Sequence, residues 1–169
     1  MARGTSAAVT SPAELPVALA ETLGATARVL ALAQAPWWVI GSAAVALHGA
    51  AVEVGDVDVL LAEDDARRLL PRIGLHPRPG QSDGRFRSAS FARWDAAPLA
   101  VEFMAGLHVA GPNGWAPVNL LTRVPVARGD TTLFVPSRAE LATLLRRFDR
   151  AKDLTRTALL NGSILTDHA

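Results

Sequence analysis

The 169-residue sequence contains no cysteine, which excludes disulfides, thiolate zinc sites and cysteine nucleophiles. Any metal site must therefore be built from carboxylates, imidazoles or carbonyl oxygens. Lysine is nearly absent as well: Lys152 is the only lysine, and the other 16 residues of the Lys+Arg total of 17 are arginines. This scarcity makes Lys152 a residue to consider as a ligand of a phosphate group.

The sequence also lacks a strong excess of charge and a long uninterrupted apolar run. Its 17 basic and 16 acidic residues give a formal net charge of +1. This balance argues against a nucleic-acid coat or a polybasic membrane anchor, but it leaves a local basic groove open. The most apolar long segment, residues 16–35, is interrupted by Glu21 and Arg28 and makes a poor membrane span. We therefore expect a cytoplasmic protein with no membrane partner.

The length and the apolar patterns predict one domain of the α+β class. We expect a flexible N-terminus over residues 1–14 and a single domain over residues 15–169, built as a small mixed β-sheet flanked by α-helices and ending in a pair of helices. Helices are predicted at 16–33, 43–48, 63–73, 138–148 and 150–160, and strands at 36–40, 54–62, 85–92, 98–106 and 132–135. The rest of the stretch 112–137 is predicted to be irregular.

Two aspartates lie one residue apart in a valine-rich segment that has the pattern of a strand, "VGDVDVLLA". Because side chains on a strand alternate between its faces, Asp56 and Asp58 are expected to point the same way. Their Cα atoms would lie about 7 Å apart, so both carboxylates could reach one cation. Oxygen ligands of this kind favour Mg²⁺ or Mn²⁺. A solvated edge strand or an ion-pair network is the alternative interpretation of the pair.

A third acid, Glu102, lies in the apolar strand pattern "LAVEFMAG". The apolar residues on its expected face, Ala100 and Met104, indicate a mostly covered surface rather than open solvent. Glu102 is therefore a candidate third ligand for the same cation.

The segment "IGS", Ile40 to Ser42, lies between a predicted strand and a predicted helix. Gly41 permits a close approach of the backbone, and the Ser42 hydroxyl can donate a hydrogen bond. The first amides of the helix could hold a phosphate. A simple helix cap is the alternative interpretation of a Gly-Ser pair taken alone.

At these residues the sequence resembles the nucleotidyltransferase superfamily, which has the DNA polymerase β-like fold. The family pattern is a hydrophobic residue, Gly-Gly or Gly-Ser, a helix, and then two acids that alternate with hydrophobic residues, with a third carboxylate on a later strand. Here Ile40-Gly41-Ser42 and "DVDV" match the first two elements, and Glu102 fits the third. The segment "RAKDLTRTALL" is similar to one near the end of small bacterial stand-alone members, some of which are toxins of abortive-infection or toxin–antitoxin pairs. The resemblance covers residues 36–160.

The resemblance implies a metal-dependent transfer of a nucleoside monophosphate from an NTP to a hydroxyl of an unidentified acceptor, which could be a small molecule, RNA or protein. It implies that Asp56, Asp58 and Glu102 are catalytic and bind Mg²⁺ or Mn²⁺, and that Glu102 accepts the proton of the incoming hydroxyl. Gly41 and Ser42 would bind the β and γ phosphates of ATP or another NTP.

Lys152 could reach the triphosphate from the last helix, or it could be a surface residue paired with Asp149 or Asp153. The sequence has Val52 and Val54 where small members often carry an arginine and a threonine. Two alternative functions stay open: a non-catalytic nucleotide- or partner-binding member of the same fold, and a toxin-type transferase acting on RNA or protein and restrained by an antitoxin.

Overall fold

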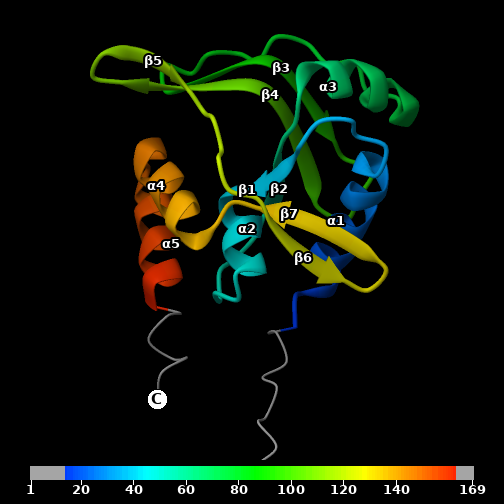
Figure 1. Cartoon of the computed structure of the whole chain (residues 1–169), viewed down its shortest axis with the longest axis horizontal. Helices are drawn as coiled ribbons and strands as arrows, with labels where there is room; N and C mark the ends of the chain where they lie inside the picture. The colour runs from blue at the N-terminus through cyan, green and yellow to red at the C-terminus, as the bar shows by residue number, and fades with distance from the viewer. Residues whose placement is uncertain (1–13, 163–169) are drawn as a thin grey trace, which may run out of the picture.

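In the computed structural model, residues 14–162 form a mixed β-sheet surrounded by helices (Figure 1). The N-terminal segment that we predicted to be flexible lies, apart from Glu14, outside the described residues. The elements in chain order are α1 (Val17–Leu30), β1 (Trp38–Ile40), α2 (Gly41–Leu47), β2 (Asp56–Leu60), α3 (Glu63–Leu69), a 3-10 turn (Leu70–Ile73), β3 (Phe86–Trp94), β4 (Ala100–Gly111), β5 (Gly114–Pro117), β6 (Val124–Arg128), β7 (Thr131–Val135), α4 (Arg138–Phe148) and α5 (Ala151–Gly162).

The main sheet has the strand order β1-β2-β4-β3, and β5 pairs with the distal part of β4. Strands β2 and β4 run parallel, whereas β1 pairs antiparallel with β2 and β3 pairs antiparallel with β4. The parallel pair requires a crossover, which is provided by α3 and by β3 at the edge of the sheet. The sheet is therefore mixed, which confirms the predicted α+β class.

Alternating side chains on the two central strands divide the sheet into an apolar face and an acidic face. Val57, Val59 and Val101 are fully buried, and Phe103 is 1% exposed. These four residues belong to the hydrophobic core, together with apolar residues of the surrounding helices. The intervening residues of the same strands are half-buried and point to the other side. Burial of the valine face thus fixes the direction in which the acids point.

The helices are distributed around the sheet as Figure 1 shows. The C-terminal pair, α4 and α5, packs together on one side next to α2, while α1 and α3 lie on the opposite side. Helix α1 begins at Val17, directly after Pro16, as the position of that proline predicts. Among residues 14–162, no helix combines the length and the apolar character needed to cross a bilayer.

The stretch 112–137 contains three strands where the sequence predicted one. Strands β6 and β7 form a separate antiparallel hairpin closed by Gly129-Asp130, and Gly129 has a φ of 58°, which a glycine adopts without strain. The prediction of an irregular stretch was wrong because Pro117 and Pro125 argue against strands. These prolines are exposed and lie on two-stranded or edge pairings, where a missing amide donor is tolerated.

Candidate active site

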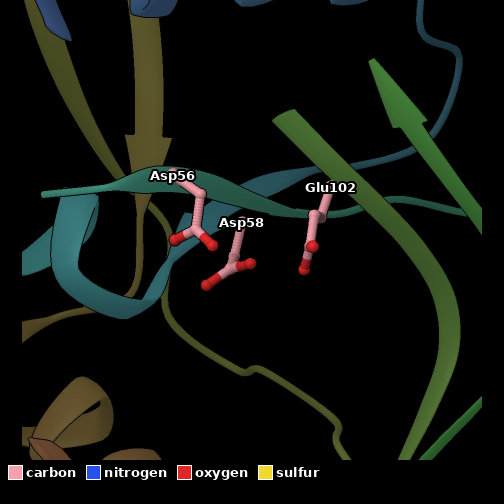
Figure 2. Close-up of side chains that lie close together, drawn as sticks. All are labelled: Asp56, Asp58 and Glu102. Carbon is pink, nitrogen blue, oxygen red and sulfur yellow. The ribbon is translucent and has the colours of Figure 1, made fainter. Parts of the chain in front are cut away.

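Three carboxylates converge on the acidic face of the sheet. Asp56 and Asp58 come from β2 and Glu102 comes from β4, and Figure 2 shows all three side chains directed to the same side of the ribbon. Each carboxylate has an oxygen within 4.8 Å of an oxygen of the other two. The structure therefore brings together the three residues that the sequence singled out as metal ligands.

The strand register explains this convergence. Asp58 is directly opposite Glu102 in the parallel β2–β4 pair, so both side chains leave the sheet on the same face. Asp56 is two residues before Asp58 on the same strand and shares that face. A slip of one residue in this pairing would turn Glu102 away from the aspartates.

The convergence has an electrostatic cost that is largest at Asp58. Burial and the neighbouring charges of Asp56 and Glu102 together raise the pKa of Asp58 to about 7, with burial the larger cause. The guanidinium groups of Arg150 and Arg156 act in the opposite direction but do not cancel the shift. A carboxylate held in this way gains more from a bound cation than a solvated carboxylate does.

Gly41 lies against Asp58 at the start of α2. A Cβ atom at Gly41 would lie 2.6 Å from Oδ2 of Asp58, and Gly41 has a φ of 64°, so this position suits glycine for two separate reasons. Ser42 follows in the first turn of α2 and is 1% exposed. The structure thus places the Gly-Ser turn directly beside the acids. The interaction of Gly41 and Ser42 with phosphate stays a prediction.

Val52 and Val54, which replace the arginine and threonine of the family pattern, are half-buried and pack against the hydrophobic core. They lie on the connection between α2 and β2 and cannot bind phosphate through a side-chain charge or hydroxyl. Cationic groups for the acidic face must therefore come from another part of the chain.

Helix α5 and the residue before it supply those cationic groups. Arg150 and Arg156 lie near enough to Asp58 to influence its pKa, and both are anchored by Asp153. Asp153 is fully buried and accepts hydrogen bonds from Arg150 Nε at 2.6 Å, Arg150 Nη2 at 3.1 Å and Arg156 Nη1 at 3.4 Å. The Arg150 guanidinium also lies 4.9 Å from the centroid of the Phe86 ring. Asp153 therefore fixes the position of both arginines.

Sequence reasoning missed this trio and named Lys152 instead. The structure places Lys152 on the exposed side of α5, outside the set of residues that line the acidic cleft. Asp153, which we had considered as a partner of Lys152, pairs with arginines. The signal was present in the sequence, since Asp153 shares the helical spacing of the buried Thr157 and Leu160. An aspartate on the apolar face of a helix implies a buried partner.

Arg93 is a third cationic residue near the acids that the sequence did not single out. It lies opposite Glu102 on β3, and its Nη1 is 3.1 Å from Glu102 Oε1. Its Nε is 3.0 Å from the carboxylate of Asp95. Glu102 is thus flanked by Asp58 on one neighbouring strand and by Arg93 on the other. This contact restrains the longest of the three acidic side chains.

A cavity of about 520 Å³ opens in front of the acids. Asp58 and Glu102 form part of its wall, and Phe86, Phe148 and Arg150 form another part. The loop before β3 closes a third side. The cavity is large enough for a nucleotide-sized ligand and combines apolar walls with a few charged groups, as small-molecule sites commonly do.

The donor set of the three acids suits a hard divalent cation. All the available side-chain ligands are carboxylate oxygens that lie close together, and burial together with the neighbouring acids raises the pKa of Asp58. Mg²⁺ and Mn²⁺ prefer such oxygen ligands and are commonly held by a few carboxylates together with phosphate oxygens of a substrate.

The fold is that of nucleotidyltransferases. A candidate nucleotidyltransferase of Thermotoga maritima, TM1012, superposes with a TM-score of 0.64 at 24% identity, over 83% of this chain and 91% of that chain. The antibiotic-resistance factor ANT(2″)-Ia matches in a solution structure (TM-score 0.51, 10% identity, 86% of this chain, 82% of that one). A crystal structure of ANT(2″)-Ia in complex with adenylyl-2″-tobramycin gives the same score and identity, over 85% and 86% of the two chains. No family model and no curated protein matches the sequence.

Proposed function

We propose that this chain, which has the nucleotidyltransferase fold, is a metal-dependent enzyme that transfers a nucleoside monophosphate from an NTP to a hydroxyl. The observation that carries the proposal is the convergence of Asp56, Asp58 and Glu102 close to Gly41, with Asp58 and Glu102 in the wall of a cavity of nucleotide size. The fold alone would be compatible with many activities, so the proposal rests on the site.

Asp56, Asp58 and Glu102 would hold the divalent cation, Mg²⁺ or Mn²⁺. When bound, such a cation offsets negative charge on phosphate oxygens and orients the substrate for in-line displacement. The unfavourable charge concentration at Asp58 is relieved by the same cation. The clustering of the acids would thus destabilise the site without the cation and strengthen the binding of the cation.

Arg150 and Arg156 would hold phosphate oxygens from the side opposite the sheet. Arg150 is restrained by Asp153 and by its position over Phe86, so it loses little conformational freedom when it binds an anion. The two arginines would provide the positive charge that Val52 and Val54 cannot. Gly41 and Ser42 would bind the β and γ phosphates, and Lys152 would add a mobile cationic contact from the surface of α5.

The hydroxyl oxygen of the acceptor would attack the α-phosphorus of the NTP, and Glu102 would accept the proton of that hydroxyl. The bond between the α-phosphorus and the bridging oxygen breaks, and pyrophosphate leaves with the electron pair. Glu102 is suited to this role because its carboxylate borders the cavity and is restrained by Arg93 rather than buried.

Incubation of the full chain with each α-labelled NTP and Mg²⁺ tests this proposal. We expect release of pyrophosphate and labelling of an acceptor or of the protein itself. Asp58→Asn should lower the rate at least about 100-fold, because loss of a catalytic carboxylate removes several kcal/mol of transition-state stabilisation. Asp64→Asn is the matched control, since Asp64 is also an aspartate but its side chain is 92% exposed on α3.

Two results separate the alternatives. Binding of NTP without turnover, at the same affinity in Asp58→Asn, would contradict the enzymatic proposal and favour a nucleotide-binding module. Growth arrest that depends on Asp58 and is relieved by a neighbouring gene would favour the toxin-type transferase. An antitoxin partner and the identity of the NTP are proposals that the same assays address.

A further inference from the structure

Besides Arg150, five arginines line two neighbouring cavities of the protein. Arg78 and Arg87 border the acidic cavity, and Arg85, Arg146 and Arg147 border a second cavity of about 540 Å³. Within residues 14–162, none of the five forms an ion pair with a carboxylate. Their positive charge is therefore available to a ligand, although the whole chain is nearly neutral.

The two cavities share two walls. Consecutive residues of the β3 segment line them, with Arg85 in the second cavity and Phe86 in the acidic one. The end of α4 is shared in the same way, because Arg147 and Asp149 border the second cavity and Phe148 borders the acidic one. A hydrogen bond of 2.6 Å from Arg85 Nη1 to the carbonyl oxygen of Phe148 joins the two walls at the boundary. An extended ligand could therefore occupy both cavities.

Two of these arginines, Arg147 and Arg87, show how the guanidinium group is held by neutral partners. Arg147 Nη2 donates to the carbonyl oxygens of Ala116 at 3.4 Å and Pro117 at 3.1 Å in β5. The Arg87 guanidinium lies 4.7 Å from the centroid of the Trp115 ring. Carbonyl and aromatic partners orient a guanidinium without neutralising it, and most of its five N–H donors stay free. Such groups bind phosphate well.

We infer that the second cavity and its arginines bind the phosphodiester backbone of the acceptor, and that the acceptor is a single-stranded polynucleotide whose terminal hydroxyl reaches the acids. This inference rests on the proposed function. The backbone lies along Arg85, Arg146 and Arg147, and Trp115 offers an aromatic surface near Arg87 for a base. An acceptor rich in amines would be repelled by the same arginines.

The reaction then lengthens the strand by one nucleotide. The terminal hydroxyl oxygen forms a bond to the α-phosphorus of the NTP, and the bond from that phosphorus to pyrophosphate breaks. The hydroxyl proton passes to Glu102 and from there to solvent, and pyrophosphate carries away the electron pair. The NTP supplies the transferred group, so no further reactant is needed.

Binding is measured first, without NTP and in the presence of EDTA, so that catalysis plays no part. A fluorescent single-stranded RNA and the DNA of the same sequence serve as probes. If five arginines contact phosphates, the logarithm of the affinity should fall against the logarithm of the salt concentration with a slope of about −3.5. The double substitution Arg146→Gln/Arg147→Gln should reduce that slope by about 1.4 and weaken binding at least about tenfold at low salt.

Two further variants keep the binding test decisive. Arg67→Gln/Arg72→Gln removes the same charge from exposed positions after β2 and should leave binding unchanged. Arg146→Lys/Arg147→Lys keeps the charge and should retain most of the affinity. If the guanidinium groups acted only by holding β5 in place, lysine could not replace them and the affinity would fall. Weak, salt-independent binding, or equal loss in the Arg67/Arg72 control, would overturn the inference.

Incorporation is measured next with labelled NTPs, Mg²⁺ and unlabelled strands. Lengthening of the RNA, the DNA or both supports the inference and identifies the preferred strand. Arg146→Gln/Arg147→Gln should raise the KM for the strand and leave the KM for the NTP unchanged. Pyrophosphate release that continues with both strands present but unaltered would overturn this inference and leave the proposed function intact, whereas absence of any turnover would count against the proposed function itself.

Discussion

Among the single residues of the site, Asp58 has the ionised form that the folded protein disfavours most clearly. The pKa of this carboxyl is raised from 3.8 in a solvated chain to about 7 in the folded protein. Between these two values the folded state holds a proton that the unfolded state has released, so protonation favours folding. The free energy of unfolding therefore falls as the pH rises from about 4, and the loss is complete above pH 7, where the folded protein carries the charge. The acid is therefore retained at a cost to the fold, as is common at functional sites.

Asp58→Asn should therefore stabilise the metal-free protein at alkaline pH. We expect the free energy of unfolding to rise by about 2 kcal/mol near pH 8, less than the full pKa difference implies, because Asp58 is only half-buried and solvent screens part of the repulsion. The gain should shrink as the pH falls below 7 and disappear only near pH 4, where the folded and the unfolded wild-type protein both hold the proton. Urea unfolding in EDTA at both pH values measures the difference. Asp64→Asn should show no such pH dependence, and a gain of equal size at both pH values would contradict the explanation.

Gly41 is the residue at which backbone and carboxylate are closest. Gly41→Ala would place Cβ 2.6 Å from Asp58 Oδ2 at a φ of 64°, so either the carboxylate or the turn must move. We expect a loss of about 1–3 kcal/mol in the free energy of unfolding and weaker binding of Mg²⁺. Gly55→Ala is the control, since a Cβ there meets no atom within 4 Å. Equal effects of the two substitutions on Mg²⁺ affinity would contradict a specific role of Gly41.

At the scale of elements, α5 contributes to the site through one buried charge. Asp153 is 0% exposed and accepts hydrogen bonds from Arg150 and Arg156, which reach toward Asp58. Asp153 itself does not border the acidic cavity, so it acts as a positioning residue. Through Asp153, helix α5 thereby holds Arg150 in the wall of the cleft.

Asp153→Asn should weaken both the fold and the binding of NTP. Removing one partner from a buried ion cluster costs about 3–5 kcal/mol, because the remaining charges are left uncompensated. The KM for NTP should rise at least about tenfold in a protein that stays folded, since Arg150 is no longer held in place. Circular dichroism and steady-state kinetics below the melting temperature separate the two effects.

A milder variant and a control keep this test informative. Arg156→Gln leaves the bidentate pair of Arg150 and Asp153 in place and should lower stability less while still raising the KM for NTP. Asp149→Asn is the control, because Asp149 is exposed and asparagine tolerates its left-handed backbone at a φ of 53°. An unchanged KM in both Asp153→Asn and Arg156→Gln would contradict the positioning role.

Most elements could be predicted because their signals are local. The valine-rich alternation around Asp56 and Asp58 identified β2, and Ser137, which accepts a hydrogen bond from the Glu140 amide, marked the start of α4. Strand β7 was predicted at 132–135, but its partner β6 was not, because Pro125 interrupts the pattern of a strand. Such prolines are excluded from central strands but not from a small exposed hairpin.

At the scale of the whole molecule, the site depends on a pairing that no local pattern reveals. The sequence identified all three acids by residue type and alternation. That Glu102 is opposite Asp58 follows from the parallel register of β2 and β4, which lie more than 40 residues apart. Arg93 was missed for the same reason, since its partner Glu102 lies on a neighbouring strand. Arg150 and Arg156 pair locally with Asp153, but their position near Asp58 follows only from the folded chain. Side-chain chemistry was thus predictable, whereas its spatial combination was not.

The assembled site should couple cation binding to the stability of the entire chain. A ligand that binds only the folded state at about 100 times its dissociation constant adds about 2.7 kcal/mol to the free energy of unfolding. For a chain of this size, this corresponds to a rise in Tm of about 5–10 °C. Calorimetry with Mg²⁺ and after its removal by EDTA measures this shift.

The shift should also depend on pH in a direction that Asp58 determines. With a pKa of about 7, Asp58 must lose a proton before it can bind the cation, so the Mg²⁺-induced rise in Tm should be full near pH 8 and shrink as the pH falls below 7. Titration calorimetry in buffers of different ionisation enthalpy should detect proton release on binding near pH 6. Asp58→Asn should abolish most of the rise, and Asp64→Asn should preserve it. A rise that is independent of pH, or that survives in Asp58→Asn, would mean that the cation binds elsewhere on the protein.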